Sequence, residues 1–304
     1  MKNVSIIIIS YNRPDDTLDL LKDITLFSNI ELLEKVVILN NRSTVDYTEV
    51  TNFISENIHI PFHFIDAPEN LGVSRGRNYA TQFANGNILF YVDDDVNLKD
   101  KETLQKLLTA FNADKRNDRT LGVVSFKVLH TSNMQMQVNA LPHKKFDAHK
   151  DLHEFPTYYY AGCAHAKLRQ AWLDAGPYPE NFFYGMEEYD FSFRMLNKNY
   201  YIKYDDSLVV LHKESPLGRN TKAEKLRMMW VNKTKVAWRY LPKKYFYSTF
   251  FMWGMFYLVK SRFNFQNFIK GLKESINIPS SEKRNPLSKE TLNYFKEVDA
   301  RLWH

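Results

Sequence analysis

Short apolar runs alternate with segments of helical spacing along the first third of the chain. Continuous apolar runs of this length are typical of buried strands, whereas leucines and isoleucines three or four positions apart indicate helices. The expected strands are residues 4–9, 36–39, 62–65 and 88–92. The expected helices between them are residues 15–24 and 74–84. This alternation predicts an α/β fold in which helices flank a mainly parallel sheet.

Polar residues stand where three of these strands are expected to end. Residues 10–13 follow the first strand, residues 40–43 the second, and Asp93, Asp94 and Asp95 the fourth. Ligands of such sheets bind at the carboxyl ends of the strands, so we expect the three segments to converge on one site. Adjacent carboxylates repel one another, and Mg²⁺ or Mn²⁺ would offset their charge and also hold phosphates. Taken alone, the acidic run also fits an ordinary polar turn.

A second acidic cluster lies far along the chain. Glu187, Glu188 and Asp190 precede a segment that begins at Phe191 and has the spacing of a helix. Carboxylates in a first helical turn stabilise the helix through its dipole, which is the purely structural interpretation of this cluster. Arg194 follows Asp190 by four positions, the spacing at which two helical side chains form an ion pair.

A small-residue turn and a histidine complete the set of candidate residues. Gly162 and Cys163 follow three tyrosines, and His212 ends the apolar run 208–211. Glycine lets a backbone approach a ligand closely, although an ordinary turn explains it equally well. A cysteine without a neighbour that lowers the pKa of its thiol is expected to be a small buried residue. A lone histidine after a strand is usually structural, and the histidines show no zinc-site spacing.

The composition fits an enzyme that works inside the cell. With 304 residues, 44% of them hydrophobic, the chain is expected to form one large domain with an appendage. The single cysteine excludes an internal disulfide, and no signal peptide is recognised, so we expect a cytoplasmic protein. The net charge of +6 indicates an anionic partner. Because no nucleic-acid motif is present, that partner is expected to be a diphosphate substrate or an anionic membrane.

The first glycine of the chain, Gly72, lies far beyond the first strand. P-loop NTPases and Rossmann dehydrogenases need a glycine-rich phosphate loop directly after that strand, so its absence counts against both classes. The same absence counts against a nucleotidyltransferase, which is kept as the alternative enzyme class.

The last third of the chain differs in character. Eight lysines and arginines between residues 222 and 244 precede an apolar, aromatic run at 245–259, which Lys260 and Arg262 close. The run is too short and too aromatic for a typical transmembrane helix. It fits a basic helix lying in the membrane interface. It fits equally a helical hairpin packed on the catalytic domain or against a second copy.

Five segments in a fixed order resemble family 2 glycosyltransferases: VSIIIISYNR, VVILNNRS, NLGVSRGRN, ILFYVDDD and GMEEYDFSFR. The resemblance covers residues 1–215 and implies a GT-A fold, with a nucleotide-binding half at 1–110 and an acceptor half at 111–215. It also implies a nucleotide-diphosphate sugar donor and a metal-dependent displacement that inverts the anomeric configuration. Residues 216–304 are expected to form a helical C-terminal extension, which most resembles the tails of rhamnosyltransferase-like members acting on surface polysaccharides.

The resemblance implies roles for individual residues. Those expected to bind the nucleotide sugar are Ser10, Tyr11, Arg13, Asn40, Arg77, Asp93, Asp94 and Gly162. Those expected to bind Mn²⁺ or Mg²⁺ are Asp95, His212 and Asp93. The expected catalytic residues are Glu188 as general base, Glu187 as the alternative base, and Asp190 to orient the loop or the helix.

Two positions depart from the family's pattern. Asn40 stands where members usually carry an aspartate that accepts a hydrogen bond from uracil or thymine, and its amide oxygen can still accept one. A UDP- or dTDP-sugar is therefore favoured over a GDP-sugar. Glu188 replaces an aspartate with the same chemistry on a longer side chain. The non-enzymatic alternative is a membrane scaffold with a degenerate transferase domain. The expected acceptor is a saccharide or lipid-linked saccharide at the inner face of the cell membrane.

Overall fold

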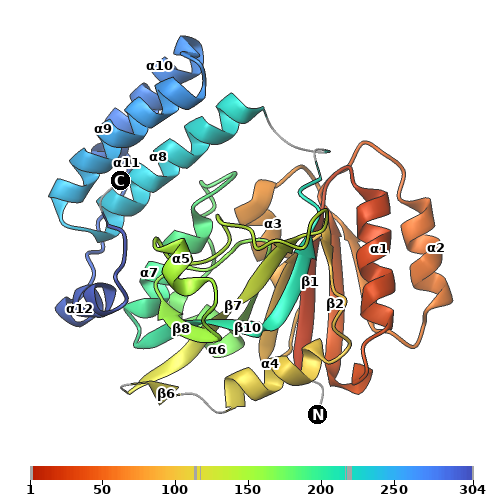
Figure 1. The fold of residues 1–304 in the computed structure, drawn as a ribbon. Coiled ribbons are helices and arrows are strands. Elements are labelled where there is room, and N and C mark those ends of the chain that lie inside the picture. The colour runs from red at the N-terminus through yellow and green to blue at the C-terminus, as the bar shows by residue number, and fades with distance from the viewer. Residues whose placement is uncertain (1–2, 113–114, 117, 216, 218–220, 303–304) are drawn as a thin grey trace.

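The computed structural model describes residues 3–112, 115–116, 118–215, 217 and 221–302. In these residues the main strands form one mixed sheet in the order β3-β2-β1-β4-β9-β7-β10-β5 (Figure 1). They are β1 (Val4–Ser10), β2 (Leu33–Asn40), β3 (Phe62–Asp66), β4 (Ile88–Asp93), β5 (Val96–Asn97), β7 (Arg119–His130), β9 (Ala164–Leu168) and β10 (Tyr200–His212). Two short strands, β6 (Lys115–Arg116) and β8 (Glu154–Thr157), pair with β7 and β10.

The four strands expected from the sequence form the parallel half of this sheet. β1 lies between β2 and β4, β3 lies outside β2, and all three pairings are parallel. The register places Ser10 opposite Asn40 and Ile9 opposite Asp93, so the strands end side by side. The expected α/β fold is therefore confirmed, and the polar segments after the three strands meet at one edge.

The other half of the sheet brings distant parts of the chain to that edge. β9 is antiparallel to both β4 and β7, whereas β10 runs parallel to β7. The end of β10 also pairs antiparallel with β5, which begins directly after Asp95, and this pairing sets His212 opposite Val96. The sequence gives no sign of this pairing, because β5 is only two residues long.

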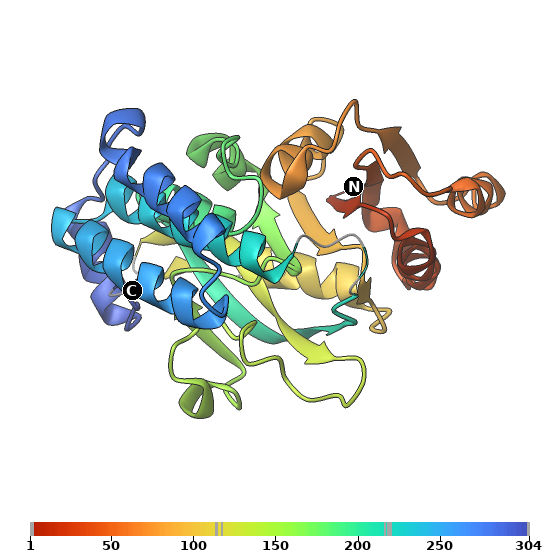
Figure 2. The same ribbon diagram turned by 90° about the horizontal axis from the view of Figure 1, so that it is seen from above.

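Helices flank the sheet (Figure 2). Those before the C-terminal third are α1 (Pro14–Thr25), α2 (Thr48–Glu56), α3 (Gly72–Thr81), α4 (Thr103–Asn112), α5 (Phe146–His149), α6 (Arg169–Ala175) and α7 (Glu187–Leu196). The expected helix 15–24 is confirmed by α1. The expected helix 74–84 begins earlier and ends earlier, because Gly72 turns the chain into α3 at a φ of 67° and residues 82–84 form tighter i→i−3 turns.

The helix expected from Phe191 begins four residues earlier, at Glu187. Gly185 and Met186 both have a left-handed backbone, with φ of 79° and 72°, and this pair ends the preceding loop. Both glutamates of the second acidic cluster therefore lie in the first turn of α7. The expected start at Phe191 is therefore too late, and the carboxylates have the positions of the first-turn interpretation.

The C-terminal third folds into a layer of helices, α8 (Lys222–Tyr240), α9 (Lys243–Lys260) and α10 (Phe265–Ile276). A capping box between Thr221 and Glu224 starts α8. Trp230 of α8 is buried between α9 and α10, and its ring stacks on Tyr257 and Phe268. Added β-carbons at Gly254 and Gly271 would lie 3.0 and 2.9 Å from that ring, so the two helices approach it closely because these positions lack side chains. The run 245–259 is thus part of a packed helical hairpin.

The chain then returns to the sheet through α11 (Ile278–Ser281) and α12 (Lys289–Glu297). The Tyr294 hydroxyl donates to the Thr157 carbonyl at 2.8 Å, and Phe295 belongs to the same hydrophobic core as the strands. The division of the chain at residue 215 stays a prediction. Among the described residues, none of the helices has both the length and the apolar content needed to span a bilayer.

Candidate active site

A cavity of about 800 Å³ opens at the edge where β1, β2 and β4 end. Its wall comes from these strand ends, from α3, from Phe183 and Tyr184, and from Glu214, Leu217 and Lys225. The lining residues are Ile9, Tyr11, Asn12, Arg13, Asn41, Asn70, Gly72, Val73, Arg77, Asp93, Asp94, Asp95, Phe183, Tyr184, His212, Glu214, Leu217 and Lys225. The acidic run, both expected arginines, Tyr11 and His212 are therefore brought together.

Arg13 balances part of the negative charge of the acidic run. Its Nη1 lies 2.7 Å from Asp94 Oδ1 and 3.2 Å from Asp95 Oδ2. Burial outweighs the favourable charge of Arg13 and raises the pKa of Asp94 to about 7. The positive charge of Arg13 alone therefore does not offset the negative charge of Asp93, Asp94 and Asp95.

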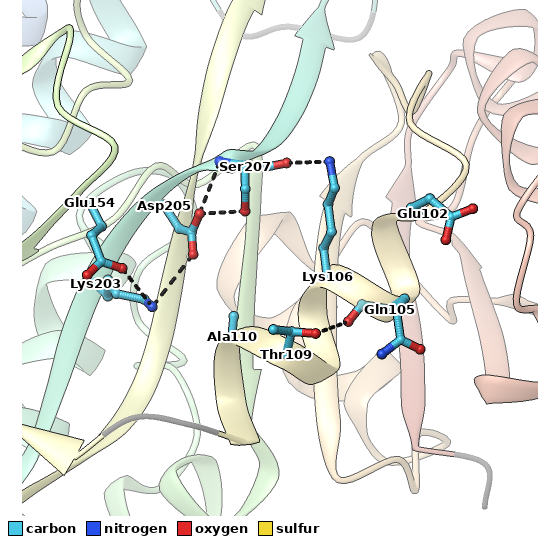
Figure 3. Close-up of a pocket in the computed structure, with 9 residues that line it drawn as sticks. All are labelled: Glu102, Gln105, Lys106, Thr109, Ala110, Glu154, Lys203, Asp205 and Ser207. Carbon is cyan, nitrogen blue, oxygen red and sulfur yellow. Dashed lines mark hydrogen bonds and ion pairs between the residues drawn. The ribbon is translucent and has the colours of Figure 1, made fainter.

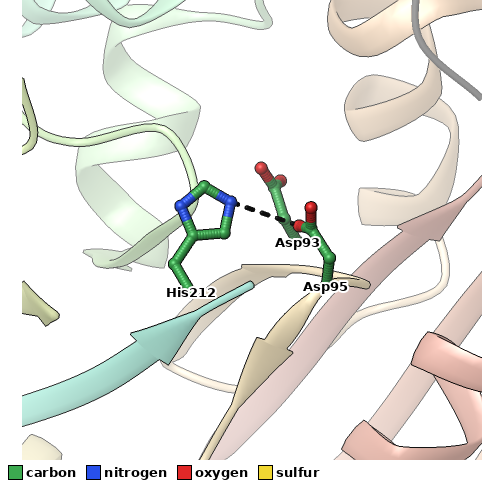
Figure 4. Close-up of side chains that lie close together, drawn as sticks. All are labelled: Asp93, Asp95 and His212. Carbon is green, nitrogen blue, oxygen red and sulfur yellow. Dashed lines mark ion pairs between the residues drawn. The ribbon is translucent and has the colours of Figure 1, made fainter. Parts of the chain in front are cut away.

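Asp93, Asp95 and His212 offer three ligand atoms that lie within 4.8 Å of one another (Figure 4). His212 Nε2 lies 3.3 Å from Asp95 Oδ1, and its Nδ1 is hydrogen-bonded to Gln137 Oε1 at 3.1 Å. Gln137 thus orients the ring with Nε2 toward the carboxylates, as an outer partner of a ligating histidine does. The pairing of β5 with β10 is what brings His212 to this place.

The donor types of this cluster fit a divalent cation. Carboxylate oxygens and an imidazole nitrogen are ligands of Mn²⁺, and carboxylates are ligands of Mg²⁺. Burial raises the pKa of Asp93, and the charge of Asp95 adds to the rise. Burial lowers the pKa of His212, but its hydrogen bonds with Asp95 and Cys163 prevail and raise that pKa to about 11. The imidazolium thereby supplies positive charge where a bound cation would otherwise do so.

Arg77 links the two acidic clusters. Its side chain is 5% exposed, and Nη2 lies 3.2 Å from Asp93 Oδ1 while donating to the Gly162 carbonyl at 2.9 Å. Its Nη1 lies 2.9 Å from Glu188 Oε1 and 3.3 Å from Glu187 Oε1. A single guanidinium therefore fixes the distance between the metal-ligand cluster and the carboxylates of α7.

Glu187 and Glu188 differ in their surroundings. The Glu188 side chain is 14% exposed, whereas that of Glu187 is 3% exposed and its Oε2 has no hydrogen-bond partner among the described residues. Burial and the charge of Glu188 raise the pKa of Glu187 well above its usual range. Glu188 is the more exposed of the two carboxylates, so it is the better candidate base. Gly162 leaves room for Glu188, because an added β-carbon would overlap Oε1.

Asp190 anchors α8 to α7. Its carboxylate lies 2.9 Å from Arg194 Nε, the expected i,i+4 contact, and 2.7 Å from Arg239 Nη1. It also accepts a hydrogen bond from the Tyr240 hydroxyl at 2.8 Å. With these three partners, and at 1% exposed, it serves to orient the helices.

Three of the expected donor-binding residues, Ser10, Asn40 and Gly162, lie outside the cavity lining. Ser10 is fully buried, and its hydroxyl is hydrogen-bonded to those of Thr17 and Tyr47. The Asn40 amide donates to Asp66 and accepts from the Ser43 N–H. The side chains of Ser10 and Asn40 therefore connect the strand ends to neighbouring segments.

Several lining residues were missed by sequence reasoning. Asn41 follows Asn40 in the same strand end and shapes the wall by bonding Asn70 and the Gly72 carbonyl. The motif at 40–43 therefore reaches the cavity through Asn41, and the role expected of Asn40 in donor binding stays a prediction. Lys225 reaches the cavity from α8, and no local sequence pattern reveals this.

A second groove, of about 580 Å³, lies between α4 and β10 (Figure 3). Its lysines are already engaged: Lys203 pairs with Glu154 and Asp205, and Lys106 donates to the Ser207 carbonyl. The residues that line this groove include none of the expected site residues, whereas Tyr11, Arg13, Arg77, His212 and the acidic run line the first cavity.

A family model described as glycosyl transferase family 2 matches residues 5–171, more than half of the chain. A protein of Haemophilus influenzae without a characterised function is 29% identical over 180 residues, which cover 58% of this chain and 92% of that protein.

Solved structures share the fold at low sequence identity. The mannosyltransferase PcManGT from Pyrobaculum calidifontis, in complex with GDP-Man and Mn²⁺, has a TM-score of 0.61 at 14% identity and covers 98% of this chain and 79% of its own. Residues 1–349 of S. aureus TarS, in complex with UDP-GlcNAc, give 0.61 at 16% identity over 91% and 81%. GalNAc-T7 with UDP, GalNAc and Mn²⁺ gives 0.61 at 15% identity over 94% and 59%. These likenesses show the GT-A fold.

Proposed function

The chain belongs to glycosyl transferase family 2, and we propose that it moves a sugar from a nucleotide-diphosphate donor to a saccharide or lipid-linked saccharide. One observation carries the proposal: Arg77 joins a metal-ligand cluster in the cavity to a partly exposed carboxylate, Glu188. A diphosphate leaving group needs positive charge, and an acceptor hydroxyl needs a base. The candidate metal ligand Asp93 and the candidate base Glu188 both contact Arg77.

We propose that residues at the strand ends bind the diphosphate of the donor. Asp93, Asp95 and His212 would hold Mn²⁺ or Mg²⁺, which when bound would offset the charge of the diphosphate as it leaves. Arg13 and Lys225 also line the cavity and would add positive charge to the phosphate site. This arrangement favours a donor whose two phosphates lie against the acidic run.

The nucleobase site is proposed at the wall formed by Tyr11 and Asn41. A UDP- or dTDP-sugar is the donor implied by the family resemblance. PcManGT was solved with GDP-Man and TarS with UDP-GlcNAc, so both kinds of base occur among proteins of this fold.

Glu188 is proposed to activate the acceptor. Its carboxylate takes the proton of an acceptor hydroxyl, and that oxygen attacks the anomeric carbon on the face opposite the diphosphate. One displacement of this kind inverts the anomeric configuration. Arg77 holds Glu188 in place before the acceptor arrives.

The acceptor is proposed to be a growing surface polysaccharide at the inner face of the cell membrane. The support is the net charge of +6 and the basic, aromatic C-terminal extension.

Incubating the protein with a panel of UDP-, dTDP- and GDP-sugars and Mn²⁺ tests the function. We expect slow release of a nucleoside diphosphate from one donor, lost with EDTA and in Asp95→Ala. The matched control is Asp147→Ala, a 93% exposed carboxylate on α5, which should behave as the parent. Release of pyrophosphate from a nucleoside triphosphate would instead indicate a nucleotidyltransferase. Donor binding without any turnover would indicate a scaffold.

A further inference from the structure

The outer face of the hairpin formed by α9 and α10 is apolar and exposed. On α9 the exposed large side chains are Tyr247, Phe251, Met252, Met255, Phe256 and Val259. They recur every four residues in two adjacent rows, so they share one side of the helix. Across the turn and along α10 the surface continues with Phe263, Phe265, Ile269 and Ile276.

This outer face contrasts with the inner face of the same helix. Phe246, Gly254 and Tyr257 of α9 are buried against α8 and Trp230. A helix that is apolar on all sides is normally buried on all sides. On α9, however, Phe251 is 64% exposed and Val259 is 62% exposed. A contiguous exposed apolar surface of this kind marks an interaction site.

Positive charge surrounds the outer face. Residues 243–276 contain six basic residues and one acidic residue, a net charge of +5. The basic side chains are exposed and are Lys243, Lys244, Lys260, Arg262, Lys270 and Lys273. The one acidic residue, Glu274, is bound by Arg227 of α8 at 2.5 Å. The outer face therefore presents positive charge that its own carboxylate does not cancel.

We propose that this outer face docks on an anionic lipid surface, with its apolar side chains in the acyl boundary and its basic side chains among the headgroups. Anionic headgroups complement the basic rim, and each nearby lysine or arginine strengthens such attraction. A second copy of the chain is the competing occupant. A two-fold contact would oppose two surfaces of the same positive charge, which disfavours it.

The docking has a consequence for the transferase that rests on the proposed function. α8 lies against the hairpin and also carries Lys225, which lines the active-site cavity. The hairpin is on the opposite side of the molecule from α1 and α2 (Figures 1 and 2). A docked hairpin would thus hold the α8 side of the cavity toward the membrane, where a lipid-linked acceptor resides.

Co-sedimentation with vesicles of phosphatidylcholine alone, or with a third of phosphatidylglycerol, tests the docking. We expect the whole protein to bind the anionic vesicles and to be released only in part by high salt. The double variant Phe251→Gln/Met255→Gln should bind at least about tenfold more weakly, because two large apolar side chains no longer enter the lipid. The control Ile58→Gln/Leu173→Gln changes two exposed apolar residues elsewhere and should bind as the parent.

Two results would overturn the proposal. One is a full-length protein that stays in the supernatant with anionic vesicles at low salt. The other is binding that the Phe251→Gln/Met255→Gln change leaves unaltered. A concentration-dependent dimer that this variant abolishes, together with absent vesicle binding, would assign the surface to a second copy. Donor hydrolysis in the same variants separates the two proposals, because it should stay at the parental rate whether or not vesicles bind.

Discussion

The sheet edge and the outer face of the hairpin depart from an ordinary protein surface in opposite ways. At the sheet edge Asp95 and Arg77 are 1% and 4% exposed, although charged groups are costly to bury. On the hairpin, Phe251 and Val259 are mostly exposed, although burial of apolar area stabilises a fold. Each feature makes sense where a ligand completes it. We propose a divalent cation and a diphosphate as the ligands of the first, and an anionic lipid surface as the ligand of the second.

The largest expected effect comes from Asp95→Ala at the sheet edge. The change removes a ligand atom and the partner of both His212 and Arg13, so we expect metal-dependent nucleotide binding to be abolished. Circular dichroism should show an unchanged fold, since Arg13 keeps Asp94 as a partner. Calorimetric titration of the variant with UDP and Mn²⁺ checks this. Parental affinity would remove Asp95 from the ligand set.

On the buried side of the hairpin, a substitution should affect stability. Trp230→Ala should lower the free energy of unfolding by about 3–5 kcal/mol, because the two glycines hold α9 and α10 against this ring. Trp253→Ala, which alters a half-buried tryptophan of α9, is the matched control and should cost far less. Urea unfolding measures both. Equal losses of unfolding free energy in the two variants would mean that Trp230 has no special role in the packing of the hairpin.

Glu188→Gln should lower kcat by about 10²-fold or more while KM for the donor stays close to the parental value. In the proposed mechanism the charge of Glu188 acts on the acceptor, whereas the donor would lie against the acidic run. Glu187→Gln is the matched variant, with the same change one residue away. If Glu187→Gln loses activity and Glu188→Gln keeps it, the base assignment is off by one residue.

Gly162→Ala should reduce kcat by roughly tenfold with little loss of stability. The new β-carbon would displace the tip of Glu188, and a flexible side chain moves at small cost to the fold. Thermal unfolding beside steady-state kinetics checks both parts. A variant with parental kcat would show that the position of Glu188 is not critical.

The smallest effect is the pH dependence of stability at Glu187. Its pKa in the folded protein is raised above the unfolded value of 4.5, chiefly by burial. The stability contributed by the protonated carboxyl is therefore present below the unfolded pKa and is lost as pH rises through the folded one. Glu187→Gln removes this titration, so its stability relative to the parent should be greater at pH 8 than at pH 5. Urea unfolding at both pH values would contradict this if the difference were constant.

The parallel half of the fold was accessible from sequence because each of its strands is a local apolar run. The same holds for Asp93, Asp95 and Arg77, which sit beside such runs or in a recognisable motif. Helix ends were less accessible, since the early start of α7 depends on positive φ at Gly185 and Met186.

Features that depend on distant pairings could not be derived from the sequence. The approach of His212 to Asp95 follows from a two-residue strand, and its role was expected only through the family resemblance. Asn41 rather than Asn40 lines the cavity, and the Asn40 side chain is instead hydrogen-bonded to Asp66 of the neighbouring strand. Likewise, the apolar run 245–259 fitted either a packed hairpin or a membrane-facing helix, and the structure shows one packed face and one exposed face.

The main proposal is a metal-dependent diphosphate site at the sheet edge. Calorimetric titration of the unaltered protein with UDP, dTDP and GDP, each with Mn²⁺ and with EDTA, tests it directly. We expect at least one nucleotide to bind about tenfold or more tightly with Mn²⁺. Equal affinity for every nucleotide with and without the metal would contradict it.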